Sequence, residues 1–273
     1  MQLTIAMFND LRTLIYEKTG LFFTDNKKYL LESRLQARLR ERNCKTFEEY
    51  WQLIRYDAWR DKELTALFDL VTTNETYFYR DASQLQAFTD VAVPALLKLN
   101  ERTGRIRIWS AACSTGDEPY TLAMMLFEHP ALAKWTIEIL GSDISETVLA
   151  QARSGVYGPY AVRQMPASMR QKYFTEEDGQ FVLSPKVRQV VKFANINLYD
   201  KARLRLIRDM DVIFCRNCLI YFDDNGKRQI VDSLYDSLKP GGYLIIGFSE
   251  SIHGVTRSFK PVHANRTVLY QKS

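Results

Sequence analysis

Cysteine and histidine are scarce in this chain, and the few present lack the spacing of a functional site. Four cysteines among 273 residues are too few for the disulfide framework of a secreted protein of this length. Cys215 and Cys218 form a CxxC, but no second ligand pair accompanies them and no redox motif heads a helix there. The three histidines are scattered without ligand spacing. We therefore expect no metal site, and we interpret the cysteines as buried, inert thiols.

Long hydrophobic runs are also missing. No uncharged apolar stretch approaches the roughly 20 residues that span a bilayer, and the N-terminus lacks a signal-peptide pattern. A composition that is 46% hydrophobic and 25% charged is ordinary for a soluble globular protein. We expect a cytoplasmic protein without membrane insertion, and its length predicts two domains.

The positive charge is not spread evenly. The formal net charge of +5 permits an acidic partner without requiring one, and residues 1–72 are nearly balanced, with 12 basic and 11 acidic side chains. The excess lies in residues 27–42, which carry six basic and two acidic side chains. In a helix, the leucines of this segment would form one stripe with arginines beside it. This pattern is typical of a docking surface and equally of a solvated helix face.

Apolar residues at helical spacing predict an all-α N-terminal domain over residues 1–72. Gly20 is a candidate C-cap of the first helix. The next helix is expected over 25–42, with Asp25 or Thr24 as its N-cap. Thr46, with a glutamate three positions later, has the spacing of a capping box.

The pattern changes from about residue 105, where apolar strands alternate with amphipathic helices. Such alternation is typical of a mostly parallel sheet covered on both faces, which predicts a Rossmann-like α/β domain over residues 73–273. The last two expected strands have no clear helix between them, so we expect an antiparallel final hairpin.

Residues 155–190 are too many for the short loop expected at their place. Two short apolar runs flank Asp178-Gly179, a hairpin signal, and the segment after Pro185 has the composition of a third strand. We expect a small antiparallel β insertion here. The alternative is a solvated elaboration without a partner.

The stretch "WSAACSTGDEPY", residues 109–120, follows the first expected strand, where a dinucleotide loop would lie. It contains one glycine, Gly116, and its helix opens with Asp117 and Glu118. A pyrophosphate needs bare N–H groups and the positive end of the helix dipole, and two carboxylates would repel it. The loop therefore favours S-adenosylmethionine, which has hydroxyls and a positive charge and no phosphate. The alternative is that the two acids only complement the helix dipole.

Polar residues follow two neighbouring strands of the expected sheet. Asp143 is placed to accept hydrogen bonds from ribose hydroxyls, although "SDIS" is also a good N-cap sequence. Asn197 could bind the adenine edge through its amide. Ligands of such sheets bind at the carboxyl ends of the strands, so both side chains are expected in one crevice.

Six blocks of sequence, taken together and in this order, resemble the CheR-type chemotaxis receptor methyltransferases. They are "NETYFYR" (74–80), "WSAACSTGDEPYTLAM" (109–124), "GSDIS" (141–145), "NINL" (195–198), "IFCRNCLIYFD" (213–223) and "LKPGGYLIIGFSES" (238–251). The resemblance spans nearly the whole chain. It implies methyl transfer from S-adenosylmethionine to glutamate side chains of the helical cytoplasmic domain of chemoreceptors, with S-adenosylhomocysteine as product.

The resemblance also implies roles for particular residues. Arg80 and Tyr221 are expected beside the transferring methyl group, Arg80 to orient the acceptor carboxylate and Tyr221 near the sulfur. The residues expected to hold the cofactor are Asn74, Thr76, Arg80, Glu118, Asp143, Asn197, Leu198, Arg216 and Asn217. The residues expected to dock the receptor are Arg34, Arg38, Arg40 and Arg42.

Three other functions compete with this interpretation. A methyltransferase acting on RNA would suit the basic pI of about 8.9, but no RNA-binding module pattern is present and no nucleic-acid partner is expected. A non-catalytic S-adenosylmethionine-binding scaffold would not need Arg80 and Tyr221. A nicotinamide-dependent oxidoreductase is disfavoured by the acids and the missing glycines of the loop.

Overall fold

The computed structural model describes residues 2–256, 258–264 and 266–273, and residues 5–71 form a helical bundle. The elements are α1 (Ile5–Thr19), the 3₁₀ turn η1 (Asp25–Lys27), α2 (Lys28–Glu41), α3 (Phe47–Tyr56) and α4 (Arg60–Val71). Buried leucines of α2 pack with α1 and α3 in a core of their own. None of the helices in the described ranges combines the length and apolarity needed to cross a bilayer.

The helix ends follow the sequence with one exception. Gly20 ends α1 in the left-handed conformation, with φ 73°, and the Thr46 hydroxyl accepts the Glu49 N–H at the start of α3. The N-cap prediction for the second helix is confirmed in position only. Thr24 is the N-cap residue of the η1 turn, which runs directly into α2, but neither Thr24 nor Asp25 caps a helix through its side chain.

A seven-stranded mixed sheet forms the rest of the molecule, in the order β6-β2-β1-β7-β8-β10-β9. Its strands are β1 (Arg105–Ala111), β2 (Thr136–Asp143), β6 (Val191–Asn195), β7 (Met210–Cys215), β8 (Leu238–Ile246), β9 (Phe259–Ala264) and β10 (Thr267–Lys272). The five adjacent strands β6, β2, β1, β7 and β8 run parallel to one another, whereas β10 is antiparallel to both β8 and β9. The chain therefore has a Rossmann-like class I methyltransferase sheet with an antiparallel final hairpin, as predicted. The two strands expected in the hairpin, β8 and β10, do pair antiparallel, but β9, which forms the final hairpin with β10, has no counterpart in the sequence prediction.

Two hydrophobic cores sandwich the sheet, because consecutive residues of a strand point to opposite faces. Val212 and Phe214 of β7 belong to one core, and Ile213 and Cys215 belong to the other. The covering helices and turns are α5 (Ala82–Ala87), the π turn η2 (Phe88–Ala92), α6 (Val93–Leu99), α7 (Asp117–Glu128), η3 (Pro130–Leu132), α8 (Glu146–Ser154), α11 (Lys201–Leu204), η4 (Leu219–Tyr221) and α12 (Asp224–Ser237).

The expected β insertion is present as a separate three-stranded sheet, in the order β3-β5-β4. Asp178 and Gly179, both with positive φ, turn β4 (Phe174–Glu177) into β5 (Gln180–Leu183). The prediction of a strand after Pro185 is wrong, because Pro185 begins the short helix α10 (Pro185–Arg188). The third strand is β3 (Val156–Tyr157), and α9 (Ala167–Tyr173) lies between β3 and β4.

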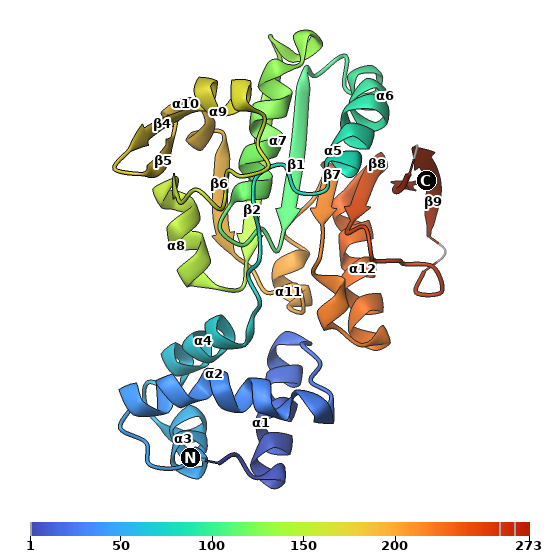
Figure 1. The fold of residues 1–273 in the computed structure, drawn as a ribbon. Coiled ribbons are helices and arrows are strands. Elements are labelled where there is room, and N and C mark those ends of the chain that lie inside the picture. The colour runs from blue at the N-terminus through green and yellow to red at the C-terminus, as the bar shows by residue number, and fades with distance from the viewer. Residues whose placement is uncertain (1, 257, 265) are drawn as a thin grey trace.

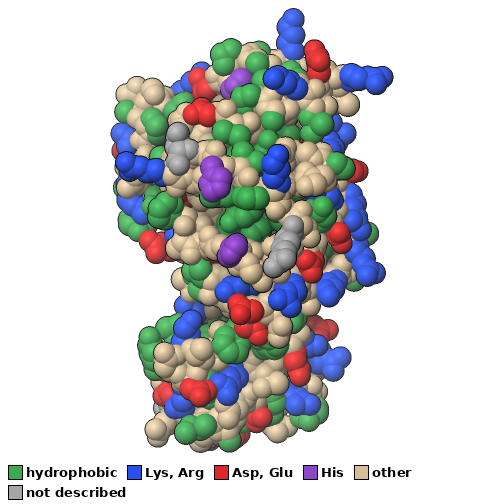
Figure 2. Space-filling model, turned by 90° about the vertical axis from the view of Figure 1, so that its right-hand side faces the viewer, with side chains coloured by type: hydrophobic (Ala, Val, Ile, Leu, Met, Phe, Trp, Pro, Cys, Tyr) green, Lys and Arg blue, Asp and Glu red, His purple; other side chains and the backbone are tan. Residues whose placement is uncertain are grey.

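The helical bundle lies at the end of the sheet toward which β1, β2 and β7 point (Figure 1). The carboxyl ends of the parallel strands therefore face the N-terminal helices, and the linker after α4 runs between the two parts. On the face shown in Figure 2, basic and acidic side chains are interspersed over both parts of the molecule.

Candidate active site

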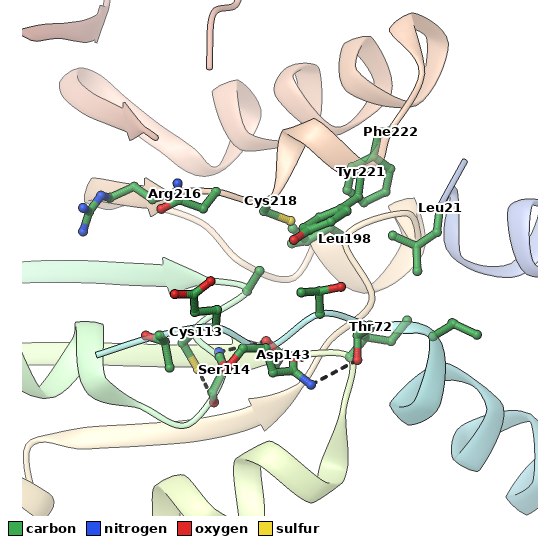
Figure 3. Close-up of a pocket in the computed structure, with 18 of the residues that line it drawn as sticks. Leu21, Thr72, Cys113, Ser114, Asp143, Leu198, Arg216, Cys218, Tyr221 and Phe222 are labelled. Carbon is green, nitrogen blue, oxygen red and sulfur yellow. Dashed lines mark hydrogen bonds between the residues drawn. The ribbon is translucent and has the colours of Figure 1, made fainter. Parts of the chain in front are cut away.

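A cleft opens at the carboxyl ends of β1, β2 and β7, between the sheet and the helical bundle (Figure 3). Every residue that the sequence assigned to the cofactor or to catalysis lines this cleft. They are Asn74, Thr76, Arg80, Glu118, Asp143, Asn197, Leu198, Arg216, Asn217 and Tyr221. The fold thus gathers side chains from five separate segments of the sequence into one site.

The loop between β1 and α7 turns tightly with a single glycine. Ala112 and Ser114 adopt left-handed backbone conformations, with φ of 59° and 49°, although neither is glycine. Gly116, with φ 86°, is where glycine is required, because a Cβ there would lie 2.9 Å from the Cβ of Ala152. The Ser114 N–H donates to Asp143 at 2.9 Å, which holds the turn against the neighbouring strand.

Glu118 is the acid of this loop that lines the cleft. Its Oε1 accepts the Ser110 hydroxyl at 2.6 Å, and its Oε2 lies 3.0 Å from Nη1 of Arg216. The same guanidinium also donates to Gln84 and to Asp81, at 2.7 and 2.9 Å. The Arg216 guanidinium is therefore held by side chains from two helices, Glu118 of α7 and Gln84 of α5, together with Asp81, the N-cap residue of α5.

Asp117 lies elsewhere, and this corrects the assumption that both acids face a cofactor. Asp117 is 1% exposed and does not line the cleft. Its Oδ2 accepts the Thr115 hydroxyl at 2.6 Å, and its Oδ1 has no hydrogen-bond partner among the described residues. Burial raises the pKa of Asp117 to about 6. Only Glu118 presents a carboxylate to the cleft at this turn.

Asp143 ends β2 with its carboxylate in the cleft wall. Its two oxygens accept the backbone N–H groups of Ser114 and Ser145, at 2.9 and 3.0 Å. Burial raises the pKa of Asp143, and the backbone donors oppose that shift. The "SDIS" stretch does cap a helix, as the alternative held, because Ser145 is the N-cap of α8 and its hydroxyl accepts the Val148 N–H. Asp143 itself is not the capping residue.

Asn197 lines the cleft, but its amide is occupied by the helical bundle. Its Nδ2 donates to the carbonyl of Lys18 at 2.6 Å, and its Oδ1 accepts the Tyr199 N–H at 2.9 Å. These bonds tether the end of α1 to the tip of β6. The adjacent Leu198 is buried, and in Figure 3 it lies beside Tyr221 and Leu21.

The linker segment 74–80 forms another wall. The Ser114 hydroxyl donates to the carbonyl of Asn74 at 3.4 Å, and the Phe78 N–H donates to the carbonyl of Ala161 at 2.9 Å. Arg80 donates through Nη1 to the carbonyl of Glu75 at 2.5 Å. The segment is thus fixed between the β1 loop and the β insertion, with the Arg80 guanidinium at the cleft.

The helical bundle also lines the cleft, which the sequence did not predict. Thr19, Leu21 and Phe22 contribute to its wall. The Phe22 N–H donates to the carbonyl of Tyr221 at 2.9 Å, and Leu21 pairs with Phe222 in an isolated antiparallel bridge. Apolar spacing in the first helix carries no signal for such a role.

The four arginines expected at a receptor surface have different surroundings. Arg34 lines the cleft and donates to the Val71 carbonyl and the Thr73 hydroxyl. Arg38 binds both oxygens of the buried Glu63, and Arg42 lies 3.2 Å from the same carboxylate. Within the described ranges, Arg40 is exposed and has no ion pair. These contacts argue against one free surface made of all four.

The two cysteines of the CxxC differ as well. Cys215 is buried, and both the neighbouring Cys218 and burial raise the pKa of its thiol well above the ordinary value. Cys218 is half-buried and lines the cleft, so its interpretation as a buried thiol is wrong.

The polar and apolar groups of the cleft fit S-adenosylmethionine rather than a pyrophosphate. A carboxylate stands at the first turn of α7, where a phosphate would need bare N–H groups. Each oxygen of Asp143 retains a lone pair for a hydroxyl. Apolar side chains wall the other end of the cleft, among them Leu21, Leu198 and Phe222.

Two family models together match almost the entire chain. The model described as "CheR methyltransferase, SAM binding domain" matches residues 74–268, and "CheR methyltransferase, all-alpha domain" matches residues 6–72.

Curated proteins of similar length are also similar in sequence. "Chemotaxis protein methyltransferase 2" of Vibrio cholerae is 38% identical over 273 residues, covering 99% of this chain and 94% of that protein. "Chemotaxis protein methyltransferase" of Borreliella burgdorferi is 35% identical over 88% of this chain and 86% of its own. "Chemotaxis protein methyltransferase 1" of Pseudomonas aeruginosa is 34% identical over 97% of both.

Proposed function

Since this chain belongs to the CheR methyltransferase family and is an S-adenosylmethionine-dependent methyltransferase of chemotaxis, we propose that it methylates glutamate side chains of chemoreceptors. The acceptors lie on the helical cytoplasmic part of the receptor, which places the reaction in the cytoplasm. The product is a glutamyl methyl ester. The observation that carries the proposal is the convergence of all ten assigned residues on one cleft whose charges suit a cationic, phosphate-free cofactor. We place the boundary between the two domains at residues 72–73.

Each wall of the cleft has a part in holding the cofactor. S-adenosylmethionine supplies a methyl group bound to a positively charged sulfur. We assign Asp143 to the ribose hydroxyls and Glu118 to the amino-acid end, where Arg216 fixes its carboxylate. Leu198 packs against the adenine. The amide of Asn197, which binds Lys18, acts by holding the helical bundle over this end of the cleft.

The chemistry needs no general base. A glutamate carboxylate titrates near pH ~4.3, so the acceptor is already an anionic nucleophile at neutral pH. Opposite charges of nucleophile and donor cancel in the transition state, so water stabilises the reactants more than the transition state. An enclosed site therefore accelerates transfer through alignment and exclusion of water.

Arg80 and Tyr221 serve this alignment. In the described structure the guanidinium of Arg80 has one hydrogen bond, to the Glu75 carbonyl, which leaves further N–H groups for an acceptor carboxylate. A tight bidentate pair would stabilise the ground state and slow the reaction, so we assign Arg80 an orienting role. Tyr221 is a neutral hydrogen-bonding group near the sulfur.

We assign receptor docking on α2 to Arg40 and the exposed edge of Arg42. The receptor segment is expected to carry acidic side chains, and exposed arginines accelerate the encounter with such a partner. Arg34 and Arg38 support this surface from within, since both have partners inside the helical bundle or its linker.

Base-labile methyl transfer tests the function. The protein is incubated with methyl-labelled S-adenosylmethionine and receptor-bearing membranes, and the pH is then raised. A carboxyl ester releases labelled methanol in base, so the label should leave the receptor band as volatile methanol. A receptor whose acceptor glutamates are replaced by alanine is the control. A base-stable label, or label that appears on RNA, would contradict the proposal.

A further inference from the structure

Glu250 binds two loops at the edge of the cleft without lining the cleft itself. Its Oε2 accepts the N–H groups of Asn217 and Gly247, at 2.8 and 2.6 Å. Its Oε1 accepts the N–H of Ile220 at 3.2 Å. Glu250 belongs to the "GFSES" stretch, to which neither the cofactor assignment nor the catalytic assignment gives a role.

The loop that Glu250 holds carries residues that line the cleft, and among them Tyr221 is assigned to the end where the methyl group is transferred. Residues 216–222 follow β7, and Arg216, Asn217, Cys218 and Tyr221 all line the cleft. The side chain of Arg216 is anchored separately, by Gln84, Glu118 and Asp81. Beyond Arg216 the chain enters a left-handed conformation at Asn217, with φ 57°. Such a conformation is costly for a residue other than glycine, and it persists where neighbouring bonds hold it.

Gly247 shows independently how closely this carboxylate is packed. A Cβ on Gly247 would lie 2.7 Å from Oε2 of Glu250 and 2.8 Å from the backbone nitrogen of Asn217. Any side chain at position 247 would therefore displace the carboxylate from the loop. Glycine is needed here for space, because the N–H groups of Asn217, after β7, and Gly247, after β8, both donate to Oε2 of Glu250.

We propose that Glu250 is a positioning residue for methyl transfer, which fixes the 216–222 loop so that Tyr221 and Asn217 keep their places at the reacting end of the cleft. This inference rests on the proposed function. Of the groups assigned to the cofactor, Asp143, Glu118 and Leu198 lie on other segments, and the Arg216 side chain is anchored separately by Gln84, Glu118 and Asp81. Only Asn217 among them is held directly by Glu250, so loss of Glu250 should reduce turnover more than cofactor affinity. The rate of in-line methyl transfer is sensitive to small displacements of the groups that align the reactants, so we expect a large loss of turnover when the loop shifts.

The test compares Glu250→Ala and Glu250→Gln with wild type. Glu250→Ala should lower kcat for receptor methylation about tenfold or more, with KM for the receptor and Kd for S-adenosylhomocysteine within about threefold. Glu250→Gln should recover much of the lost kcat, because its carbonyl oxygen can still accept from Asn217 and Gly247. Glu128→Ala is the control, since Glu128 is likewise a carboxylate that accepts several hydrogen bonds, in its case from the side chains of Lys172 and Tyr173, away from the cleft. It should keep wild-type kcat.

Gly247→Ala supplies a second route to the same defect. If it acts by displacing Glu250, the double variant Gly247→Ala with Glu250→Ala should be no slower than the slower single variant. Unchanged kcat in Glu250→Ala, or a loss of kcat matched by an equal loss of cofactor affinity, would overturn the inference. Multiplicative losses in the double variant would overturn it as well.

Hydrogen–deuterium exchange separates this inference from the proposed function. The 216–222 peptide should exchange faster in Glu250→Ala than in wild type, while the peptide that contains Asp143 is unchanged. If wild type fails to methylate receptors, the proposed function is wrong, and this exchange still decides whether Glu250 holds the loop. Equal exchange of the 216–222 peptide in the two proteins would overturn the inference by itself.

Discussion

Arg216 and Glu118 form an ion pair in the wall of the cleft, with 3.0 Å between Nη1 and Oε2. The two side chains are 3% and 15% exposed, and they are contributed by the end of β7 and the first turn of α7. The negative charge of Glu118 at the start of α7 is thus partly balanced by the positive charge of Arg216, 98 positions away in the sequence. The negative potential of this wall depends on that pairing.

Replacing Arg216 by alanine should destabilise the protein by about 3 kcal/mol, because it leaves the buried carboxylate of Glu118 without its partner. Urea unfolding followed by circular dichroism measures the change. Arg153→Ala is the control, since its ion pair with Glu146 is exposed and should contribute about 1 kcal/mol or less. If both variants lost the same free energy of unfolding, burial would not be the reason that the Arg216–Glu118 pair matters for stability.

Asp117 should make the protein less stable as the pH rises from about 4 to about 6. Its pKa is raised from the ordinary 3.8 to about 6, so the folded state holds its proton over this range while the unfolded state loses it. The folded state therefore loses stability with rising pH, by about 3 kcal/mol in total. Above pH 6 the effect is complete.

The comparison of wild type with Asp117→Asn isolates this contribution. Chemical denaturation of both proteins at several pH values should show that the stability of wild type, relative to the variant, falls between pH 4 and pH 6. A difference that stays constant with pH would show that Asp117 titrates normally.

Arg80→Ala should lower kcat about tenfold or more and leave the Kd for S-adenosylhomocysteine within about threefold. The reason is that the proposed function gives Arg80 an orienting role toward the acceptor, whereas Asp143 and Glu118, which the variant retains, hold the cofactor. Receptor methylation kinetics and calorimetry measure the two quantities. Arg163→Ala is a suitable control, because both guanidinium groups lie against the ring of Tyr77 but Arg163 does not line the cleft. Wild-type turnover in Arg80→Ala would refute the assignment.

Charge reversal on α2 should separate docking from folding. Arg40→Glu should raise KM for the receptor about fivefold at low salt, with a smaller effect at high salt and no change in thermal stability. Arg38→Glu should instead lower the melting temperature, because it places a like charge against the buried Glu63. Scanning calorimetry and methylation assays at two ionic strengths measure these outcomes. A receptor KM in Arg40→Glu that equals that of wild type would remove Arg40 from the docking surface.

Much of the sheet could be predicted because its strands leave a local apolar pattern. The exceptions are instructive. β3 has two residues, Val156 and Tyr157, too few for any periodicity, and β9 contains Pro261, which usually argues against a strand. Pro261 is tolerated because β9 lies at the edge of the sheet, where only one side of the strand is paired. The segment after Pro185 is rich in valine, yet the proline starts a helical turn.

The sequence by itself determined the helical character of the N-terminal part, the alternation of strands and helices after it, the caps at Gly20 and Thr46, and the blocks that identify the family, because these depend on residues close together in the chain. Only the tertiary structure decided which partner each polar side chain has. Asn197 binds Lys18, 179 positions away, and Arg38 binds Glu63, 25 positions away. Both side chains were candidates for contact with a ligand or a receptor, and folding gave each of them an internal partner. A hydrogen bond between distant residues leaves no periodicity in the sequence, so the use of a polar side chain is settled by what the fold brings beside it.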